Sequence, residues 1–166
     1  ICDQVYCDTP VYINEMVNKH KPSSAISTAR VNFLAHLLDN GAEENLGFED
    51  GKFPPEKTIY LTLLRNTGIH RRIGREYLLG EPHDDNFMPL WNACETFLDS
   101  TKEKPRKLGE LIKILRSRPF KLKQGVIDLW LPTFLIIKKN DYSLYNDAGV
   151  YVHTITREVL DIMQKS

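Results

Sequence analysis

Apolar residues recur at helical spacing along much of the chain, and short polar breaks separate the stretches. In the segment Ala25–Asn40, Phe33 and Leu37 fall on one stripe, and Gly41 follows as a stop signal. The Ser23-Ser24 pair precedes this stripe, and a serine oxygen can accept a hydrogen bond from the free amides of a first helical turn. The pattern therefore predicts a capped helix over Ala25–Asn40.

The same spacing indicates six further helices. They are expected at Pro10–Lys19, from Pro54-Pro55-Glu56 to the Asn66-Thr67-Gly68 stop, at Asn86–Leu98 behind a cap at Asp84 or Asp85, at Lys107–Arg116, at Gly125–Lys138, and from the Thr156 cap through Met163. Lys107–Arg116 is the most amphipathic of them. Gly125–Lys138 is apolar nearly all round, so it is either the centre of a core or a surface that docks on a neighbour.

Two short hairpins are indicated by paired segments around turn residues. One pairs 69–72 with 76–79 around Ile73-Gly74-Arg75, and the other pairs 142–145 with 150–153 around Asn146–Gly149. The order helix, helix, hairpin thus occurs twice, which is the order of a winged-helix unit. We expect a mainly α fold with two small β-hairpins, arranged as tandem winged-helix-like units over 1–100 and 101–166 that share or abut a core.

The apolar stripes also predict which side chains fill the core. These are Phe33, Leu37, Leu64, Trp91, Phe97, Leu111, Leu115, Trp130, Phe134 and Tyr151.

Composition and the length of apolar runs bear on where the protein is located. The chain has 166 residues and no net charge, and its longest apolar run, Val126–Ile137, is much shorter than the ~20 residues of a membrane helix. The three cysteines, Cys2, Cys7 and Cys94, have no framework spacing, which favours reduced thiols and a cytoplasmic location. The sequence starts without methionine and stops inside an expected helix. We therefore expect a cytoplasmic fragment of a larger protein with no membrane partner.

Motifs for catalysis are incomplete. Between Gly47 and Gly51-Lys52 there are three residues where a phosphate-binding loop needs four, and Phe53 occupies the hydroxyl position. His83-Asp84-Asp85 resembles a metal cluster in composition only, and capping of the following helix is the better explanation of its acidic residues. There is no nucleophile elbow. We expect no catalytic residue, no metal site and no cofactor.

Positive charge is concentrated in two places. Between Lys102 and Lys123 there are nine cations and two glutamates, a local net charge of +7, and a second basic tip lies near Arg71. The candidate nucleic-acid-binding residues are Arg71, Arg72, Arg75, Lys102, Lys104, Arg106, Lys107, Lys113, Arg116, Arg118, Lys121 and Lys123. Such patches suit phosphate backbones, although a solvated face that maintains solubility is the simpler explanation.

Readout of base sequence by the second unit is not expected. In a DNA-reading winged helix, the helix before the hairpin enters the major groove and exposes polar side chains. Here that position is filled by the apolar helix that contains Trp130 and Phe134. Contact with phosphates from the hairpin or the basic stretch is the remaining mode.

Several short segments resemble one known family. They are Thr9–Asn18, Ala25–Arg30, Pro54–Tyr60, Thr67–His70 and Arg118–Ile127. Together these resemble the region after the ATPase core in large bacterial P-loop proteins of antiphage defence, with the P-loop proteins of BREX-type systems the nearest. The resemblance implies an ATP-hydrolysing parent and a winged-helix-like accessory region. It transfers no nucleotide-binding residue, because the Walker elements are absent.

Two functions follow as hypotheses. The first is a non-catalytic accessory module that docks on the remainder of its parent chain or on a partner subunit. The alternative is a sequence-nonspecific DNA-binding module that grips phosphates through the basic residues. Salt-sensitive DNA binding distinguishes the two.

Overall fold

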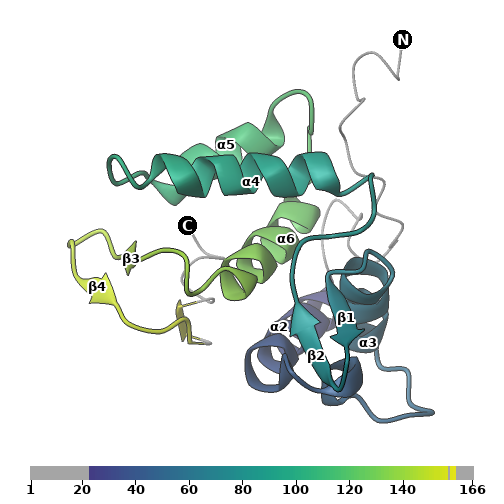
Figure 1. The fold of residues 1–166 in the computed structure, drawn as a ribbon. Coiled ribbons are helices and arrows are strands. Elements are labelled where there is room, and N and C mark those ends of the chain that lie inside the picture. The colour runs from purple at the N-terminus through teal and green to yellow at the C-terminus, as the bar shows by residue number, and fades with distance from the viewer. Residues whose placement is uncertain (1–22, 157, 160–166) are drawn as a thin grey trace.

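The computed structural model describes residues 23–156 and 158–159, and the fold is mainly α with two small antiparallel hairpins (Figure 1). The elements are α2 (Ser24–Asn40), η1 (Glu44–Gly47), α3 (Pro55–Tyr60), the π-helical turn η2 (Leu61–Arg65), β1 (His70–Ile73), β2 (Glu76–Leu79), α4 (Met88–Ser100), α5 (Leu108–Arg116), α6 (Gln124–Ile137), β3 (Leu144–Tyr145) and β4 (Tyr151–Val152). The expected fold class is confirmed, and helix, helix, hairpin occurs twice in this order. Pro10–Lys19, Cys2 and Cys7 lie outside the described residues.

The starts of α2 and α3 follow the sequence signals, and the start of α4 does not. The Ser23 side chain accepts a hydrogen bond from the Ile26 amide at 3.4 Å and caps α2, and Pro55 occupies the first turn of α3. The acidic cap expected for α4 is wrong. Asp84 Oδ1 accepts a hydrogen bond from the Asn86 amide at 2.9 Å, so it stabilises a turn before the helix, which begins only at Met88.

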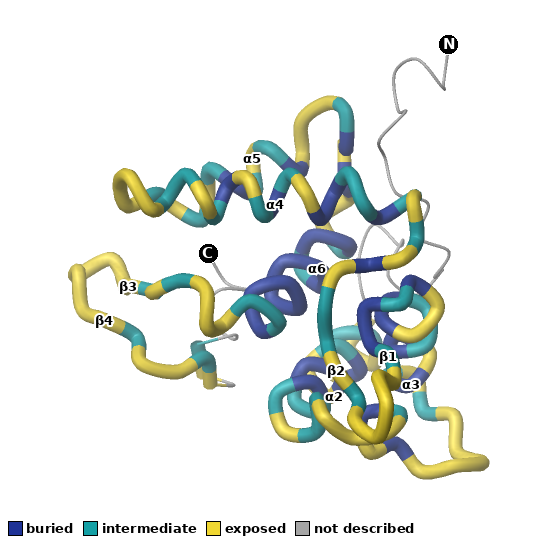
Figure 2. Tube along the Cα trace, viewed as in Figure 1, coloured by how far each residue is buried: buried dark blue, intermediate teal, exposed yellow. Residues whose placement is uncertain are grey.

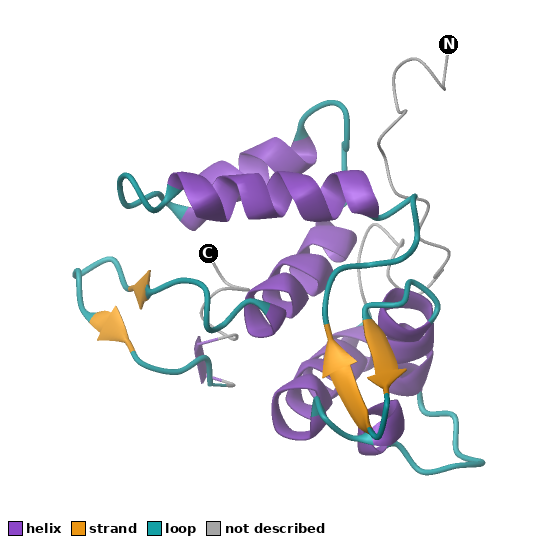
Figure 3. Cartoon of the chain, viewed as in Figure 1, coloured by secondary structure: helices purple, strands orange, loops and turns teal. Residues whose placement is uncertain are grey.

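Both hairpins form, although the second is shorter than the sequence predicts. In the first, His70 pairs with Leu79 and Ile73 with Glu76, and Gly74 has the positive φ of 65° that the turn requires. The second has two residues in each strand, with Tyr145 opposite Tyr151. Figure 3 shows that the second hairpin extends outward from the helices.

The buried residues form one continuous cluster that includes α2, α3, α4, α5 and α6. The side chains from Val126 to Ile136, apart from Asp128, are buried, so α6 is the centre of this core (Figure 2). The described parts of 1–100 and 101–166 therefore share one core. The apolar character of α6 is used within the chain itself.

Nine of the ten expected packing residues are buried, each with at most 5% of its surface exposed. The exception is Tyr151, which is 42% exposed, so its assignment to the core is wrong. Alternation in a strand predicts burial only when the sheet packs on another layer. Tyr151 and its partner Tyr145 lie on the exposed face of the β3–β4 hairpin, whereas Leu144 and Val152 on the other face are half-buried.

The helices are arranged around α6. Figure 1 shows α4 and α5 running side by side over one side of α6, with α2, α3 and the β1–β2 hairpin grouped on another side. Contacts join α2 to α6, α4 to α5, and α5 to α6. This arrangement leaves the connection between α5 and α6 at one extremity of the molecule and the β3–β4 hairpin at another.

The start of the expected last helix lies within the described residues and has the predicted cap. Thr156 Oγ1 accepts a hydrogen bond from the Val159 amide at 3.4 Å, which is the geometry of a cap. The remainder of the expected helix, up to Met163, lies outside the described residues.

Candidate nucleic-acid interface

Helix α5 separates its apolar and basic side chains onto different faces. Leu111 and Leu115 are fully buried in the shared core, whereas Lys113 and Arg116 are exposed. Residues three apart lie on the same face of a helix, so these two cations project together into solvent. The burial of the leucines therefore fixes the direction in which the cations point.

The loop from α5 to α6 folds back on the end of α5. The Leu122 amide donates to the Leu115 carbonyl at 2.9 Å, and the Lys121 amide donates to the Ser117 carbonyl at 2.8 Å. Phe120 and Leu122 insert into the core. The basic residues between and beside these anchors, at positions 118, 121 and 123, are exposed. The loop thus presents three cations beside those of α5.

A polar chain joins the ends of the two helices. Arg116 donates to the Gln124 side chain, which donates in turn to Asp128, and Asp128 forms an ion pair with Arg30 of α2 at 3.3 Å. Arg116 is therefore held beside the first turn of α6. We call the five exposed cations of this region the α5–α6 basic patch: Lys113, Arg116, Arg118, Lys121 and Lys123.

The segment that carries the α5–α6 basic patch is free of acidic residues in sequence. No acidic residue occurs between Leu111 and Ile127. The amino-terminal end of α6, which carries the partial positive charge of the helix dipole, lies in the same region. An anion at this surface would meet cationic side chains from both helices and from the loop.

The cations around the turn between α4 and α5 differ in their contacts. Lys102, Lys104 and Lys107 are exposed, and Lys102 forms an ion pair with Asp99 at 2.7 Å. The hydrogen bond from Lys102 lowers the pKa of the Asp99 carboxyl, and the same contact raises the pKa of Lys102. Lys102 is therefore a weaker candidate for phosphate contact than the cations of the α5–α6 basic patch.

Arg106 is placed where it joins α4 to α5. Its guanidinium donates to Glu110 at 2.7 Å and to Ser100 Oγ at 2.8 Å, and it lies 4.4 Å from the centre of the Phe97 ring. The hydrogen bond from Arg106 lowers the pKa of the Glu110 carboxyl. These contacts use most of its donors within the fold, so we assign Arg106 a structural role.

The β1–β2 hairpin also uses its arginines internally. Arg71 donates to the carbonyls of Gly68 at 2.8 Å and Glu81 at 2.9 Å, which ties the strand to the chain segments on either side of the hairpin. Arg72 donates to the Gly74 carbonyl at 3.1 Å within the turn. Arg71 is half-buried, so its role is to brace the hairpin.

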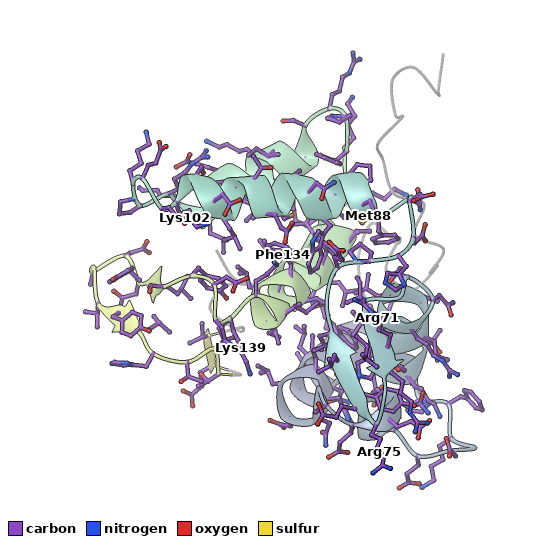
Figure 4. All side chains as sticks on the ribbon, in the orientation of Figure 1. Arg71, Arg75, Met88, Lys102, Phe134 and Lys139 are labelled. Carbon is purple, nitrogen blue, oxygen red and sulfur yellow. The ribbon has the colours of Figure 1, made fainter. Side chains whose placement is uncertain are left out.

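Arg75 is exposed at the tip of this hairpin. Figure 4 shows Arg75 and Lys102 at distant extremities of the molecule. The two basic regions that the sequence indicates therefore do not form one surface, and the α5–α6 basic patch is the denser of the two.

A buried polar pair beside this hairpin was not anticipated from the sequence. The Tyr60 hydroxyl lies 2.9 Å from His70 Nδ1, and His70 Nε2 lies 3.2 Å from the Gly41 carbonyl. Burial lowers the pKa of His70, and burial raises the pKa of Tyr60 to about 12. A neutral His70 with its proton on Nε2 satisfies both partners, so the pair links α2 and α3 to β1.

The residues that the sequence offers for metal, phosphate or thiol chemistry have the following settings in the described part of the chain. Among these residues, no three His, Cys, Asp or Glu side chains are grouped in a way that could hold a metal ion. Lys52, in the glycine-containing loop, pairs with Glu49 instead of projecting toward a free site. Cys94 is buried, and burial raises the pKa of its thiol to about 12.

Within residues 23–156 and 158–159, no helix has the length and apolar character to cross a bilayer. No protein-family model, curated protein or solved structure matches the chain. The contacts and charges described above are therefore the basis for any functional inference.

Proposed function

We propose that this chain is a non-catalytic module that binds nucleic acid through its phosphate groups, without reading base sequence. The observation that carries the proposal is the α5–α6 basic patch, where two helix ends and their loop carry five exposed cations in a segment of sequence without acidic residues. Such surfaces bind phosphates by releasing condensed counterions. A cytoplasmic location, where Cys94 would stay a free thiol, is part of the proposal.

The position of α6 supports the nonspecific mode. The helix that would enter the major groove in a DNA-reading winged helix has Trp130 and Phe134 fully buried at its centre. Its exposed end is the first turn, beside Arg116 and Lys123. Contacts from this end reach phosphates, which fix position on a nucleic acid without carrying sequence information.

The burial of α6 also weakens the docking hypothesis. The apolar character of this helix was the main reason to expect a docking surface, and the chain's own core accounts for it.

A second candidate function, an accessory module docked on the remainder of an ATP-hydrolysing bacterial defence protein, is favoured by a different observation. Ile73 and Leu78 of the β1–β2 hairpin are 51% and 44% exposed on one face. If this docking occurs, Ile73→Ser with Leu78→Ser would abolish co-elution of the module with the separately expressed remainder of the parent. Unchanged co-elution would exclude docking through this face.

The primary proposal is tested by fluorescence anisotropy of labelled DNA at low salt with matched charge variants. The patch variant replaces Lys113, Arg116, Arg118, Lys121 and Lys123 with alanine. The control variant makes the same change in net charge at exposed cations elsewhere, replacing Lys52, Arg65, Arg72, Arg75 and Lys139 with alanine.

We expect the patch variant to lose at least about tenfold in affinity, because each lost cation is a lost phosphate contact. The control variant should stay within about twofold of the unmodified chain. Equal losses in both variants would show that net charge alone drives binding. Absence of binding by the unmodified chain at low salt would reject the proposal.

A further inference from the structure

The β3–β4 hairpin carries a row of exposed aromatic rings. Tyr145 and Tyr151 are cross-strand partners with ring centres 5.6 Å apart, and His153 lies 4.5 Å from Tyr151. The two tyrosines are 58% and 42% exposed, and His153 is exposed. We call these three side chains the aromatic row.

The hairpin keeps its shape without burying the aromatic row. The Asn146 amide donates to the Val150 carbonyl at 3.0 Å, and the Asn146 side chain accepts hydrogen bonds from the amides of Ala148 and Val150. At its base, the Tyr142 hydroxyl donates to the Leu135 carbonyl at 2.7 Å. The turn and the base therefore hold the hairpin through contacts that do not involve these rings.

Exposed aromatic rings on a projecting hairpin indicate a binding surface, because water contact with this apolar area is unfavourable. The Tyr145 and Tyr151 ring planes are inclined at 53°, so the two rings are not stacked face to face. Ring faces that stay open are what a flat heterocycle requires for stacking, and every nucleic-acid base offers such a face.

Cations lie on the same side of the molecule as the aromatic row. Figure 4 shows Lys102 at the end of α4 on the side from which the hairpin extends, and the charge of Asp141, at the base of the hairpin, acts on Lys102. From Lys102, exposed cations continue through Lys104 and Lys107 to α5 and the α5–α6 basic patch. An elongated polyanion can therefore follow α5 and reach the hairpin at one end.

We propose that the aromatic row stacks on unpaired bases, so that the ligand of this chain is a single-stranded nucleic acid. The inference rests on the proposed phosphate binding and adds the class of nucleic acid. A duplex buries its base faces in its own stack and presents only edges and phosphates. A single strand offers open base faces to aromatic side chains, and such stacking tolerates any sequence. This agrees with the burial of α6, which leaves that helix unavailable for groove readout.

The test uses two probes of equal charge, a labelled oligothymidylate of about 15 nucleotides and an abasic sugar-phosphate chain of the same length. Both are titrated against the unmodified chain, the patch variant, a Tyr145→Ala/Tyr151→Ala variant and a Tyr145→Phe/Tyr151→Phe variant. Circular dichroism checks that each variant remains folded, which we expect because both tyrosines are exposed.

We expect the unmodified chain to bind the thymidylate at least about tenfold more tightly than the abasic chain, since stacking on even one base has that effect. The alanine variant should lose this preference and keep its affinity for the abasic chain, and the phenylalanine variant should keep the preference. If the unmodified chain binds neither probe, the proposed function fails as well. If it binds both equally and the patch variant binds neither, phosphate binding stands and base stacking is refuted. An alanine variant that retains the preference also refutes stacking by these rings, and would leave them as a surface for a protein.

Discussion

Replacement of Trp130 by alanine tests whether α6 is the centre of the core. Trp130 is fully buried at the middle of α6, and its ring centre lies 5.8 Å from that of Phe87, 6.3 Å from Trp91 and 6.2 Å from Phe134. These partners lie before α4, in α4 and in α6, so the indole joins separate elements at the centre of the core.

The expected cost follows from two contributions. Truncation of a buried aromatic side chain to alanine removes its transfer free energy and leaves a cavity, which together cost about 3–5 kcal/mol. Each aromatic pair adds roughly 0.5–1.5 kcal/mol beyond the buried area. With three ring partners, Trp130→Ala should fall in the upper part of this range, about 4–5 kcal/mol.

Urea unfolding followed by far-UV circular dichroism measures this cost without relying on tryptophan emission. With a slope near 2 kcal/mol per molar urea, the midpoint should fall by about 2 M at unchanged slope. Trp130→Phe keeps one ring in place and should cost only about 1–2 kcal/mol. A loss below about 1 kcal/mol for Trp130→Ala would refute the assignment of α6 as the centre of the core.

Three smaller predictions probe other parts of the structure. Because burial lowers the pKa of His70 below 6.5, the unfolded chain binds the additional proton, so stability should be complete above about pH 6.5 and fall as the pH drops through the folded pKa; His70→Gln should flatten this dependence in urea titrations. Cys94, whose thiol pKa is raised to about 12, should resist alkylation by iodoacetamide until the chain unfolds, as read by peptide mass spectrometry; rapid labelling of the native chain would contradict its burial. A methyl group at Gly109 in α5 meets no neighbouring atom within 4 Å, so Gly109→Ala should stabilise the chain by up to about 1 kcal/mol and raise the midpoint of thermal unfolding. A lowered midpoint would indicate a hidden contact.

Local signals along the chain were sufficient to predict most helices and the core. Ser23, the Pro54-Pro55 pair and the stripe through Leu111 and Leu115 each have a single physical interpretation, and the structure agrees with each one. Helical periodicity is informative because it reports directly which face must be buried.

The sequence was less informative where burial depends on distant segments. Tyr151 lies between Val150 and Val152 in a strand-like segment, and this local pattern does not indicate which face of the hairpin turns inward. The structure exposes Tyr151 and half-buries Val152. Arg106 and Arg71 belong to the basic stretches, yet tertiary contacts with Phe97 and with backbone carbonyls occupy their guanidinium groups. The number of charges in a segment can be counted from the sequence, but which charged side chains make contacts within the fold cannot.

The spatial arrangement of the candidate site also depends on tertiary contacts. The run from Lys102 to Lys123 reads as one basic segment, but α5 distributes it over two ends of a helix about 13 Å long. The five residues of the α5–α6 basic patch gather because Phe120 and Leu122 anchor the loop against the core. No local signal in the sequence indicates that anchoring.

The salt dependence of nucleic-acid binding tests the central claim most directly. If the five cations of the α5–α6 basic patch each contact one phosphate, the logarithm of the association constant should fall against the logarithm of salt concentration with a slope of about −3.5 for a single strand and about −4.5 for a duplex. The patch variant should show a much shallower slope, while the control variant keeps that of the unmodified chain. The same slope in the patch variant as in the unmodified chain would contradict the account, because the phosphates would then be held elsewhere.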